Sequence, residues 1–390
     1  MSVLTGVDIF ESDKKFEDYK NLKIGLVANQ ASLNQYMEST ADVLNRLCPG
    51  HLSVLMGPQH GYSGEDQDNM VETSHQREKH LNIPIFSLYS ATREPTDEML
   101  YGLDVLFIDL QDVGTRVYTF IATMLNCMKK CASAKKPFVV LDRPNPLGGD
   151  IVEGNILKPH MYSFVGTYRL PMRHGMTMGE LAMLFNEVFS LGCDLKVVPV
   201  KGWRRTMLWR DTGLKWHMPS TNMPCYETAV VYPGQVVWEG TTLSEGRGTC
   251  RPFEIWGAPY INPTNIKELL SPKILNGCVL QEYCFRPTFN KWKDALCKGF
   301  MIHITNENVF RSYLLSLSVL QAVLKVYPES FAWKEPPYEY EYERMPIDLI
   351  IGDEEIRKNL EEGADVLDLA REWEENLLKY DRWRRQFFLY

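Results

Sequence analysis

Short apolar runs alternate with helical patterns over the first half of the chain. Six runs rich in Val, Ile, Leu and Phe predict strands, at residues 23–28, 52–56, 83–88, 105–110, 138–141 and 195–200. Continuous apolar runs of this length suit strands that are buried on both faces of a parallel sheet. Between them, residues 117–134 and the segment that follows the capping box Thr177–Glu180 have the periodicity of amphipathic helices. This alternation predicts an α/β domain with a doubly wound, mostly parallel sheet.

The pattern changes after about Pro224. Residues 225–260 are dense in Gly, Pro and aromatic residues, and residues 334–344 have the Glu/Tyr/Pro-rich composition of a loop. The other elements predicted in this half are strands at 278–285 and 300–304 and helices at 312–326, 353–360 and 366–379. We therefore predict two domains, an N-terminal one over residues 1–226 and a smaller α+β domain over residues 227–390 that completes a cleft.

Composition restricts the class of partner. Hydrophobic residues make up 45% of the chain and charged residues 24%, as in an ordinary globular protein. The formal net charge of −8, from 42 basic and 50 acidic residues, argues against a general nucleic-acid binder, which needs a basic face. No apolar run reaches membrane-spanning length, and the first residues lack the charged and apolar regions of a signal peptide. We expect a small-molecule or oligosaccharide partner, and a cytoplasmic location unless the N-terminus was trimmed from a secreted chain.

Polar side chains follow five of the predicted strands at the point where each strand ends. They include Asn29, Gln59, His60, Tyr89, Arg93, Asp109, Asp112, Arg143 and Asn145. Ligands of open α/β sheets bind in the crevice beyond the carboxyl ends of the strands. Five polar strand ends together therefore predict a site for a polar small molecule.

Missing motifs exclude several familiar classes of site. No G-x-G-x-x-G follows the first strand and no G-x-x-x-x-G-K-[ST] occurs, which argues against dinucleotide and P-loop sites. Neither G-x-S-x-G nor H-E-x-x-H is present, which argues against a serine-hydrolase elbow and a zincin. His60, Glu65, Asp66 and Asp68 could hold a divalent ion, as a metal-dependent hydrolase would require, but a solvated turn is the favoured interpretation. We predict no organic cofactor and no metal.

Three later segments have the composition of site loops. Arg173–Gly175 precedes the capped helix, Lys201–Arg205 follows the sixth predicted strand, and Trp238–Thr249 opens the second domain. The last segment holds Glu239, Glu245 and Arg247 among several glycines. Glycine lets the backbone approach a ligand closely, and an Arg fork binds a carboxylate or phosphate through two hydrogen bonds. The alternative for each segment is a tight turn with a surface ion pair.

At these segments the chain resembles the exo-acting β-N-acetylmuramidases of peptidoglycan turnover, the NamZ family. The resemblance is carried by GLVANQASLN (25–34), GPQHGYSGEDQ (57–67), PIFSLYSATREPTDEML (84–100), DVLFIDLQDVGTRVYTF (104–120), LDRPNPLGG (141–149), RHGMTMGELAMLFN (173–186), NMPCYETAVVYPG (222–234), EGTTLSEGRGTCRPFEIWGAP (239–259) and RRQFFLY (384–390). It covers essentially the whole chain. It implies a Rossmann-like N-terminal domain, a smaller C-terminal domain, and a cleft in which N-acetylmuramic acid is removed from the non-reducing end of bacterial cell-wall glycans.

One position departs from the family pattern with chemical consequences. Members typically read G-P-E-H-G, and that Glu is the leading candidate for the catalytic carboxyl, whereas this chain has Gln59. An amide cannot act as a general acid near neutral pH, and glycosidases usually need a carboxylic acid to protonate the leaving oxygen.

Three interpretations of Gln59 stay open. In the first, another carboxyl acts as the acid, from Glu65, Glu153, Glu239 or Glu245. In the second, the 2-acetamido group of the substrate is the nucleophile and Gln59 orients it. In the third, the protein binds muramyl sugars and is catalytically silent. Retained hydrolysis is the preferred interpretation, because the rest of the motif set is intact.

The resemblance and the chemistry of the sugar together define the predicted site. The catalytic candidates are Gln59, His60, Glu65, Glu153 and Glu245. A muramyl sugar carries a lactyl carboxylate on O3, and Arg143, Arg173 or Arg247 could hold it through a charge-assisted pair that contributes about 1.5–3 kcal/mol. The other predicted substrate-binding residues are Asn29, Asp112, Asn145, His174 and Asn222, and Trp203 or Tyr232 is a candidate for stacking on the sugar ring.

Overall fold

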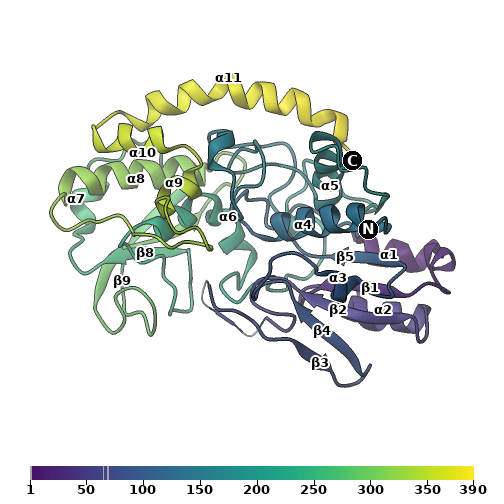
Figure 1. Cartoon of the computed structure of the whole chain (residues 1–390). Coiled ribbons are helices and arrows are strands. Elements are labelled where there is room, and N and C mark those ends of the chain that lie inside the picture. Colours follow the sequence, from purple (N-terminus) through teal and green to yellow (C-terminus); the bar gives the residue numbers. More distant parts are fainter. Residues whose placement is uncertain (1, 65, 68–69) are drawn as a thin grey trace.

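A seven-stranded, mostly parallel sheet forms the centre of the N-terminal half (Figure 1). The structure is a computed structural model, and it describes residues 2–64, 66–67 and 70–390. The strands are β1 (Ile24–Ala28), β2 (Leu52–Gly57), β3 (Gln76–Glu78), β4 (Ile83–Ser87), β5 (Val105–Asp109), β6 (Phe138–Leu141) and β7 (Leu195–Val198). Their order is β3-β4-β2-β1-β5-β6-β7, with the edge strand β3 antiparallel to β4. The α/β prediction is confirmed, and the six predicted strands end within two residues of the observed ones.

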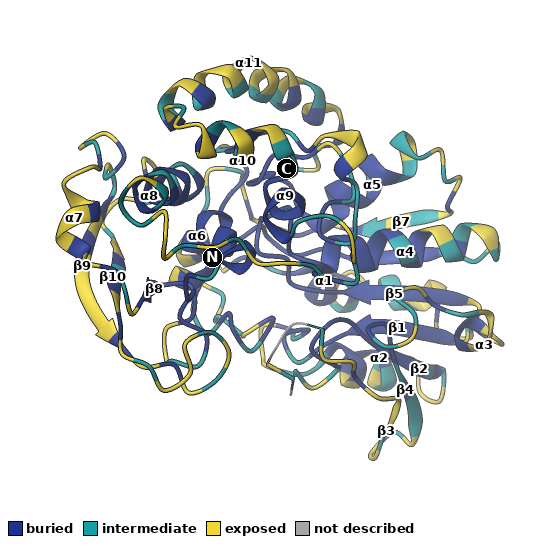
Figure 2. Ribbon diagram, turned by 60° about the vertical axis from the view of Figure 1, so that its left-hand side comes forward, coloured by how far each residue is buried: buried dark blue, intermediate teal, exposed yellow. Residues whose placement is uncertain are grey.

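Helices cover both faces of this sheet because successive residues of a strand point to opposite sides. Leu26, Phe107 and Val139 share one apolar cluster with α1 (Gly6–Ser12) and α2 (Thr40–Leu47), whereas Val27 and Ile108 share another with α4 (Phe120–Ser133) and α5 (Met178–Val188). The helices of this half are α1 (Gly6–Ser12), α2 (Thr40–Leu47), α3 (Asp97–Leu100), α4 (Phe120–Ser133) and α5 (Met178–Val188). Figure 2 shows β1 and β5 buried between these layers.

A three-stranded antiparallel sheet and several helices form the smaller C-terminal half. The sheet order is β8-β10-β9, from β8 (Ile255–Ala258), β10 (Cys297–Ile304) and β9 (Cys278–Phe285). The helices are α6 (Tyr226–Gln235), α7 (Pro263–Lys267), α8 (Ser312–Val326), α9 (Pro346–Ile351), α10 (Glu354–Glu361) and α11 (Val366–Arg384). Short 3-10 helices complete the chain at η1 (Lys15–Asp18), η2 (Pro159–Met161), η3 (Trp209–Asp211), η4 (Val236–Gly240) and η5 (Arg385–Phe387). None of the described helices is both long enough and apolar enough to span a membrane.

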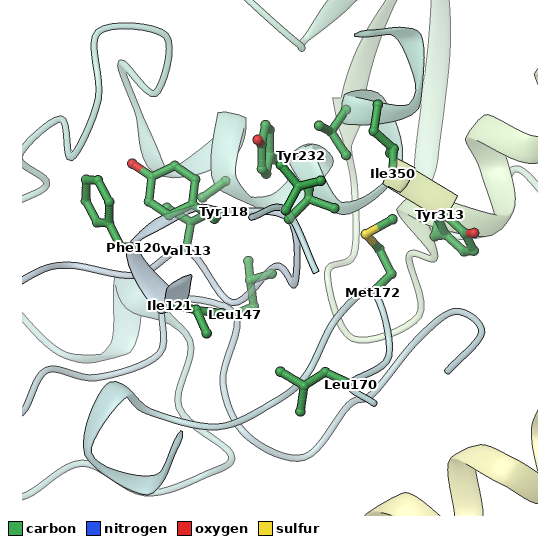
Figure 3. Close-up of a cluster of buried hydrophobic side chains, with 14 of the residues drawn as sticks. Val113, Tyr118, Phe120, Ile121, Leu147, Leu170, Met172, Tyr232, Tyr313 and Ile350 are labelled. Carbon is green, nitrogen blue, oxygen red and sulfur yellow. The ribbon is translucent and has the colours of Figure 1, made fainter. Parts of the chain in front are cut away.

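One apolar core runs through both halves. Figure 3 shows Val113 and Leu147 of the N-terminal half in the same cluster as Tyr232 and Ile350 of the C-terminal half. This core is continuous across residue 226, where the sequence predicted the boundary between two domains. The boundary therefore stays a prediction.

A buried guanidinium crosses the same junction. Arg116 is 2% exposed, and its Nη1 donates hydrogen bonds to the carbonyl oxygens of Asn155 (2.9 Å) and Leu170 (2.8 Å). Its Nη2 donates to the carbonyl oxygens of Ile350 (3.0 Å) and Ile351 (2.7 Å), where α9 ends. A side chain of the N-terminal half therefore binds the free carbonyl groups of a C-terminal helix, which have no partner inside the helix.

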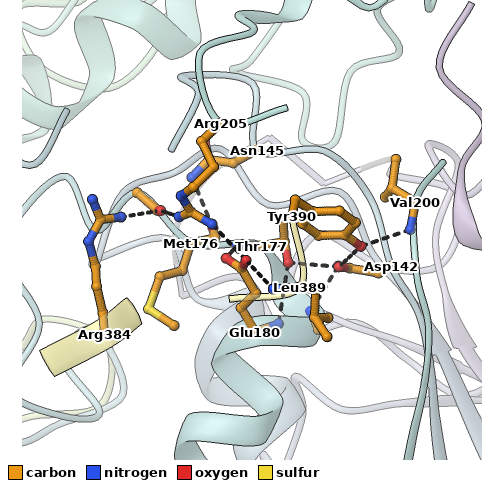
Figure 4. A network of polar contacts seen from close by, with 12 residues as sticks. Asp142, Asn145, Met176, Thr177, Glu180, Val200, Arg205, Arg384, Leu389 and Tyr390 are labelled. Carbon is orange, nitrogen blue, oxygen red and sulfur yellow. Dashed lines mark hydrogen bonds and ion pairs between the residues drawn. The ribbon is translucent and has the colours of Figure 1, made fainter. Parts of the chain in front are cut away.

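The C-terminal segment returns the chain to the N-terminal half. Helix α11 runs along the top of the molecule in Figure 1 and ends near the N-terminal domain. Beyond it, the Tyr390 hydroxyl donates to Asp142 Oδ2 (2.7 Å) and accepts from the Val200 nitrogen (2.8 Å). The Leu389 nitrogen donates to Glu180 Oε1 at 3.0 Å, as Figure 4 shows. These bonds tie residues 389–390 into the polar interior of the N-terminal half.

Candidate active site

A small polar cavity lies where the two halves meet. Its lining comes from the turn after β2, the segment before α4, residues 220–223, α6, η4 with the glycine-rich loop, and residues 338–339. The lining residues are Gln59, His60, Val117, Tyr118, Thr119, Phe120, Val165, Ser220, Asn222, Met223, Tyr232, Glu239, Arg247, Phe253, Tyr338 and Glu339. Its volume of about 30 Å³ has room for roughly two water molecules. A sugar ring therefore requires this cavity to widen.

The turn after β2 brings Gln59 to the cavity. Gly57 ends the strand so close to this turn that a Cβ atom there would lie 2.6 Å from the Tyr62 nitrogen, which excludes larger residues. The Gln59 Oε1 accepts a 2.5 Å hydrogen bond from Thr119 Oγ1. Its Nε2 donates to Glu339 Oε1 at 3.0 Å and to the Tyr89 hydroxyl at 3.2 Å. The amide is thus held with its oxygen toward α4 and its nitrogen toward Glu339.

Glu339 is a buried carboxylate that the sequence analysis did not single out. It lies in the loop at residues 334–344, which has no helix or strand, as predicted. Its Oε2 accepts a 2.7 Å hydrogen bond from the Tyr89 hydroxyl. Burial raises the pKa of the Glu339 carboxyl to about 7, although the hydrogen bond from Tyr89 opposes the rise. This carboxyl is therefore part protonated near neutral pH.

The backbone that carries Glu339 is unusual. Glu339 and Tyr340 both have left-handed conformations, with φ of 46° and 65°. Such conformations are costly for residues other than glycine and persist only where the surroundings hold them. The Arg93 guanidinium stacks on the Tyr340 ring, with Cζ 3.0 Å from the ring centroid. This stack fastens the loop to the segment that follows β4.

A second cavity carboxylate, Glu239, lies in a chain of ion pairs. Arg247 Nη2 donates to Glu239 Oε1 at 2.8 Å, and the Tyr338 hydroxyl donates to Glu239 Oε2 at 2.7 Å. Arg247 Nη1 also pairs with Glu245 at 3.3 Å, and Lys291 Nζ pairs with Glu245 at 2.8 Å. Against the effect of burial, Lys291 and Arg247 lower the pKa of Glu245 to about 2. Glu245 is therefore a fixed anion near neutral pH, which favours charge pairing over proton donation.

The glycines of residues 238–249, here called the Glu/Arg loop, pack closely against neighbouring parts of the chain. Gly246 and Gly248 have φ of +79° and +77°. A Cβ atom on Gly246 would lie 2.7 Å from the Ile255 oxygen, and one on Gly248 would lie 2.8 Å from the Phe289 nitrogen. The sequence suggested that these glycines admit a ligand. The structure instead shows that neighbouring backbone occupies the space beside them.

The structure brings part of the predicted site together. Gln59, His60, Asn222 and Arg247 line the cavity, and so does Tyr232, one of the two predicted stacking residues. The other, Trp203, lies against Tyr390 with ring centroids 5.2 Å apart, away from the cavity. Glu65 and Asp68 lie outside the described residues. Glu245 does not itself line the cavity, but it contacts Arg247 and Phe253, which do.

The predicted charged residues outside the cavity bind other parts of the chain. Glu153 accepts hydrogen bonds from the backbone nitrogens of Tyr313 (2.9 Å) and Leu314 (3.1 Å) at the start of α8. Arg143 forms a buried ion pair with Asp109, and Arg173 donates to the carbonyl oxygen of Leu147. Buried charges need such partners inside the protein. Glu153, Arg143 and Arg173 are not among the residues that line the cavity, and their assignment to the sugar site stays a prediction.

The predicted amide, Asp and His residues outside the cavity also hold the first domain together. Asn29 Nδ2 donates to the Pro219 oxygen (2.8 Å), and Asn145 Nδ2 donates to the Met176 oxygen (2.9 Å). Asp112 Oδ2 accepts a hydrogen bond from the Gly114 nitrogen (2.6 Å) and lies 3.1 Å from His174 Nε2. All four side chains are buried. Buried polar groups commonly satisfy nearby polar groups of the chain in this way, and the predicted binding role of these four residues stays a prediction.

The chain matches both parts of one protein family. Residues 24–227 match the model of the N-terminal part of the exo-beta-N-acetylmuramidase NamZ, and residues 230–390 match that of its C-terminal part. Over 388 residues the chain is 40% identical to the peptidoglycan beta-N-acetylmuramidase NamZ of Bacillus subtilis (strain 168). That comparison covers 100% of this chain and 91% of the relative.

Two crystal structures share the fold. A DUF1343 family protein from Bacteroides fragilis NCTC 9343 has a TM-score of 0.88 at 30% identity, over 100% of this chain and 99% of that one. A second DUF1343 protein from the same strain has a TM-score of 0.77 at 24% identity, with the same coverage. Both domain models together span nearly all of the sequence, and the chain therefore belongs to the NamZ family of exo-β-N-acetylmuramidases.

Proposed function

We propose that this chain is a glycoside hydrolase that removes N-acetylmuramic acid from the non-reducing end of peptidoglycan fragments. Family membership carries this proposal, since the Bacillus subtilis relative that is 40% identical over 388 residues is a peptidoglycan beta-N-acetylmuramidase. We assign the reaction to the cavity between the two halves. It joins the G-P-Q-H-G turn to the Glu/Arg loop, two segments that lie far apart in the sequence.

The side chains of the cavity suit hydrolysis of a glycosidic bond. Such enzymes generally use a pair of carboxyl groups in different protonation states. Glu239 pairs with Arg247, while Glu339 accepts hydrogen bonds from the neutral side chains of Gln59 and Tyr89. Arg247 also supplies positive charge for the lactyl carboxylate that distinguishes a muramyl sugar from a glucosamine sugar.

Release of a chromophore from 4-nitrophenyl β-N-acetylmuramide by the purified chain tests the proposed activity. We expect release from this compound and much slower release from the matching β-N-acetylglucosaminide, which lacks the lactyl group. Isothermal titration calorimetry with free N-acetylmuramic acid measures binding of the sugar independently of its hydrolysis. Binding of the free sugar without any release would instead support the silent sugar-binding alternative.

The Arg247→Ala variant tests how the lactyl group is recognised. We expect kcat/KM to fall about 10- to 100-fold more for the muramide than for the glucosaminide, because a charge-assisted hydrogen bond contributes roughly 1.5–3 kcal/mol. The informative quantity is the loss of kcat/KM for the muramide divided by the loss for the glucosaminide. Removing Arg247 also leaves Glu239 without this ion-pair partner, and this second effect lowers kcat/KM for both substrates alike. Arg251→Ala removes an exposed guanidinium near the same loop and should leave the ratio unchanged. Equal losses of kcat/KM for the muramide and the glucosaminide would exclude recognition of the lactyl carboxylate by Arg247.

A further inference from the structure

Glu339 is hydrogen-bonded to the side chain that stands where the family carries its glutamate. We propose that Glu339 is the acid that protonates the leaving oxygen of the glycosidic bond in this chain, and that Gln59 is a positioning residue for it. The inference rests on the proposed hydrolysis and deepens it, because it names the proton donor.

The hydrogen bonds of Gln59 determine how its amide is oriented toward Glu339. Thr119 donates to the Gln59 oxygen, so the amide presents its nitrogen to Glu339. A nitrogen donor holds one Glu339 oxygen in place without adding a negative charge beside it. Tyr89 holds the other oxygen from the end of β4. The carboxyl of a loop residue is therefore oriented by two side chains of the N-terminal sheet, 280 and 250 positions away in sequence.

The other carboxyl candidates are less suited to donating a proton. Glu153 binds the start of α8, and Glu245 pairs with Lys291 and Arg247; neither lines the cavity. Glu239 lines it but forms an ion pair with Arg247. Within the described part of the chain, Glu339 is thus the cavity carboxyl that forms no ion pair with Lys, Arg or His.

The surroundings of Glu339 favour its protonated form. The polar and charged groups around it are Gln59, His60, Tyr89, Tyr232, Glu239, Arg247, Tyr338 and Tyr340. Burial raises the pKa of Glu339, the negative charge of Glu239 adds to the rise, and the positive charge of Arg247 opposes it. An acid with a pKa near the working pH is efficient in proton transfer, because it is protonated in the resting state and still donates readily.

The proposed step balances with water as the second reactant. The bond between C1 of the muramyl sugar and the glycosidic oxygen breaks, and its electron pair stays on that oxygen. The oxygen takes the proton of Glu339 and leaves as an alcohol. Water then supplies the hydroxyl group at C1, and its remaining proton restores the Glu339 carboxylic acid.

Two substrates with different leaving groups test this assignment. The first is the disaccharide of N-acetylmuramic acid and N-acetylglucosamine, whose leaving alcohol needs a proton. The second is 2,4-dinitrophenyl β-N-acetylmuramide, whose phenolate leaves without one. We expect Glu339→Gln to lower kcat/KM about 10²–10⁴-fold for the disaccharide and less than about 10-fold for the aryl glycoside. Glu343→Gln, an exposed change in the same loop, should alter neither value.

The wild-type chain gives an independent readout should the variant fail to fold. We expect kcat/KM for the disaccharide to fall as pH rises above about 7, and the aryl glycoside to show no such fall. Equal losses on both substrates in Glu339→Gln, or no loss on either, would overturn the assignment and leave the proposed hydrolysis intact. A wild-type chain that cleaves neither substrate would overturn the hydrolysis itself.

Discussion

Replacing Arg116 with methionine is expected to lower the free energy of unfolding by about 4 kcal/mol or more, since each hydrogen bond to a charged group contributes roughly 1.5–3 kcal/mol. The guanidinium donates to four backbone carbonyl oxygens from two segments of the N-terminal half and from the end of α9. Burial lowers the pKa of Arg116 to about 10, which leaves it charged at neutral pH. Methionine fills the space but removes the guanidinium donor, although the Leu170 oxygen keeps its hydrogen bond from the Leu157 nitrogen and the Ile351 oxygen keeps that from Asn155 Nδ2.

Urea-induced unfolding followed by circular dichroism measures this loss. Arg371→Met is the matched control, because Arg371 lies exposed on α11 with a surface ion pair, and such changes usually stay within about 0.5 kcal/mol. If the methionine variant does not accumulate, Arg116→Lys retains the charge and should lose less stability. A methionine variant within 1 kcal/mol of the wild type would contradict the structural task given to Arg116.

The Glu339→Gln variant is expected to change how stability depends on pH. The folded carboxyl has a pKa of about 7, against an ordinary value of 4.5. The folded state therefore binds this proton more tightly than the unfolded state does. Its stabilisation is fully present below pH 4.5 and is lost as pH rises through 7. A difference of about 2.5 units corresponds to roughly 3 kcal/mol, at 1.36 kcal/mol for each unit.

The measurement is the free energy of unfolding at several pH values between 4.5 and 8. The stability of the wild type relative to Glu339→Gln should fall by roughly 3 kcal/mol over that range, because glutamine does not titrate. The Glu343→Gln control should run parallel to the wild type. Parallel curves for the wild type and Glu339→Gln would show that residue 339 does not hold a proton more tightly in the folded state.

The strands were predictable because their residues are buried on both faces. Runs such as those of β1 and β5 are apolar at every position, and the structure buries all of their residues. Their boundaries could be placed within two residues. Strand β3 could not be predicted, because Gln76–Glu78 lies at the sheet edge and has no apolar residue.

Other elements contradict their local preferences. Helix α6 contains Pro233 and Gly234, which both count against a helix interior. Gly234 lies so close to α8 that a Cβ atom there would meet the Ser312 oxygen. Packing between the two helices therefore decides the structure of this segment, and that packing is not encoded in its own residues.

The candidate site was predictable only in part. The turn with Gln59 and the loop with Arg247 carry local motifs, and both reach the cavity. Glu339 lies in a segment with several Glu and Tyr residues, so its composition alone does not distinguish the buried carboxyl from its exposed neighbours. Glu153 was a candidate as an alternative carboxyl acid and Arg173 as a partner for the lactyl carboxylate, but a large core also uses such charged residues for internal hydrogen bonds.

The hydrogen bond between Tyr390 and the end of the sheet joins parts of the chain that are synthesised at different times. Val200 and Tyr390 are 190 residues apart, and translation at about 5–20 residues per second takes roughly 10–40 seconds to cover that distance. During this interval the N-terminal half can begin to fold on the ribosome, while Asp142 still lacks one of its hydrogen-bond donors. The N-terminal half of the nascent chain therefore attains its complete interior only after residue 390 has left the exit tunnel.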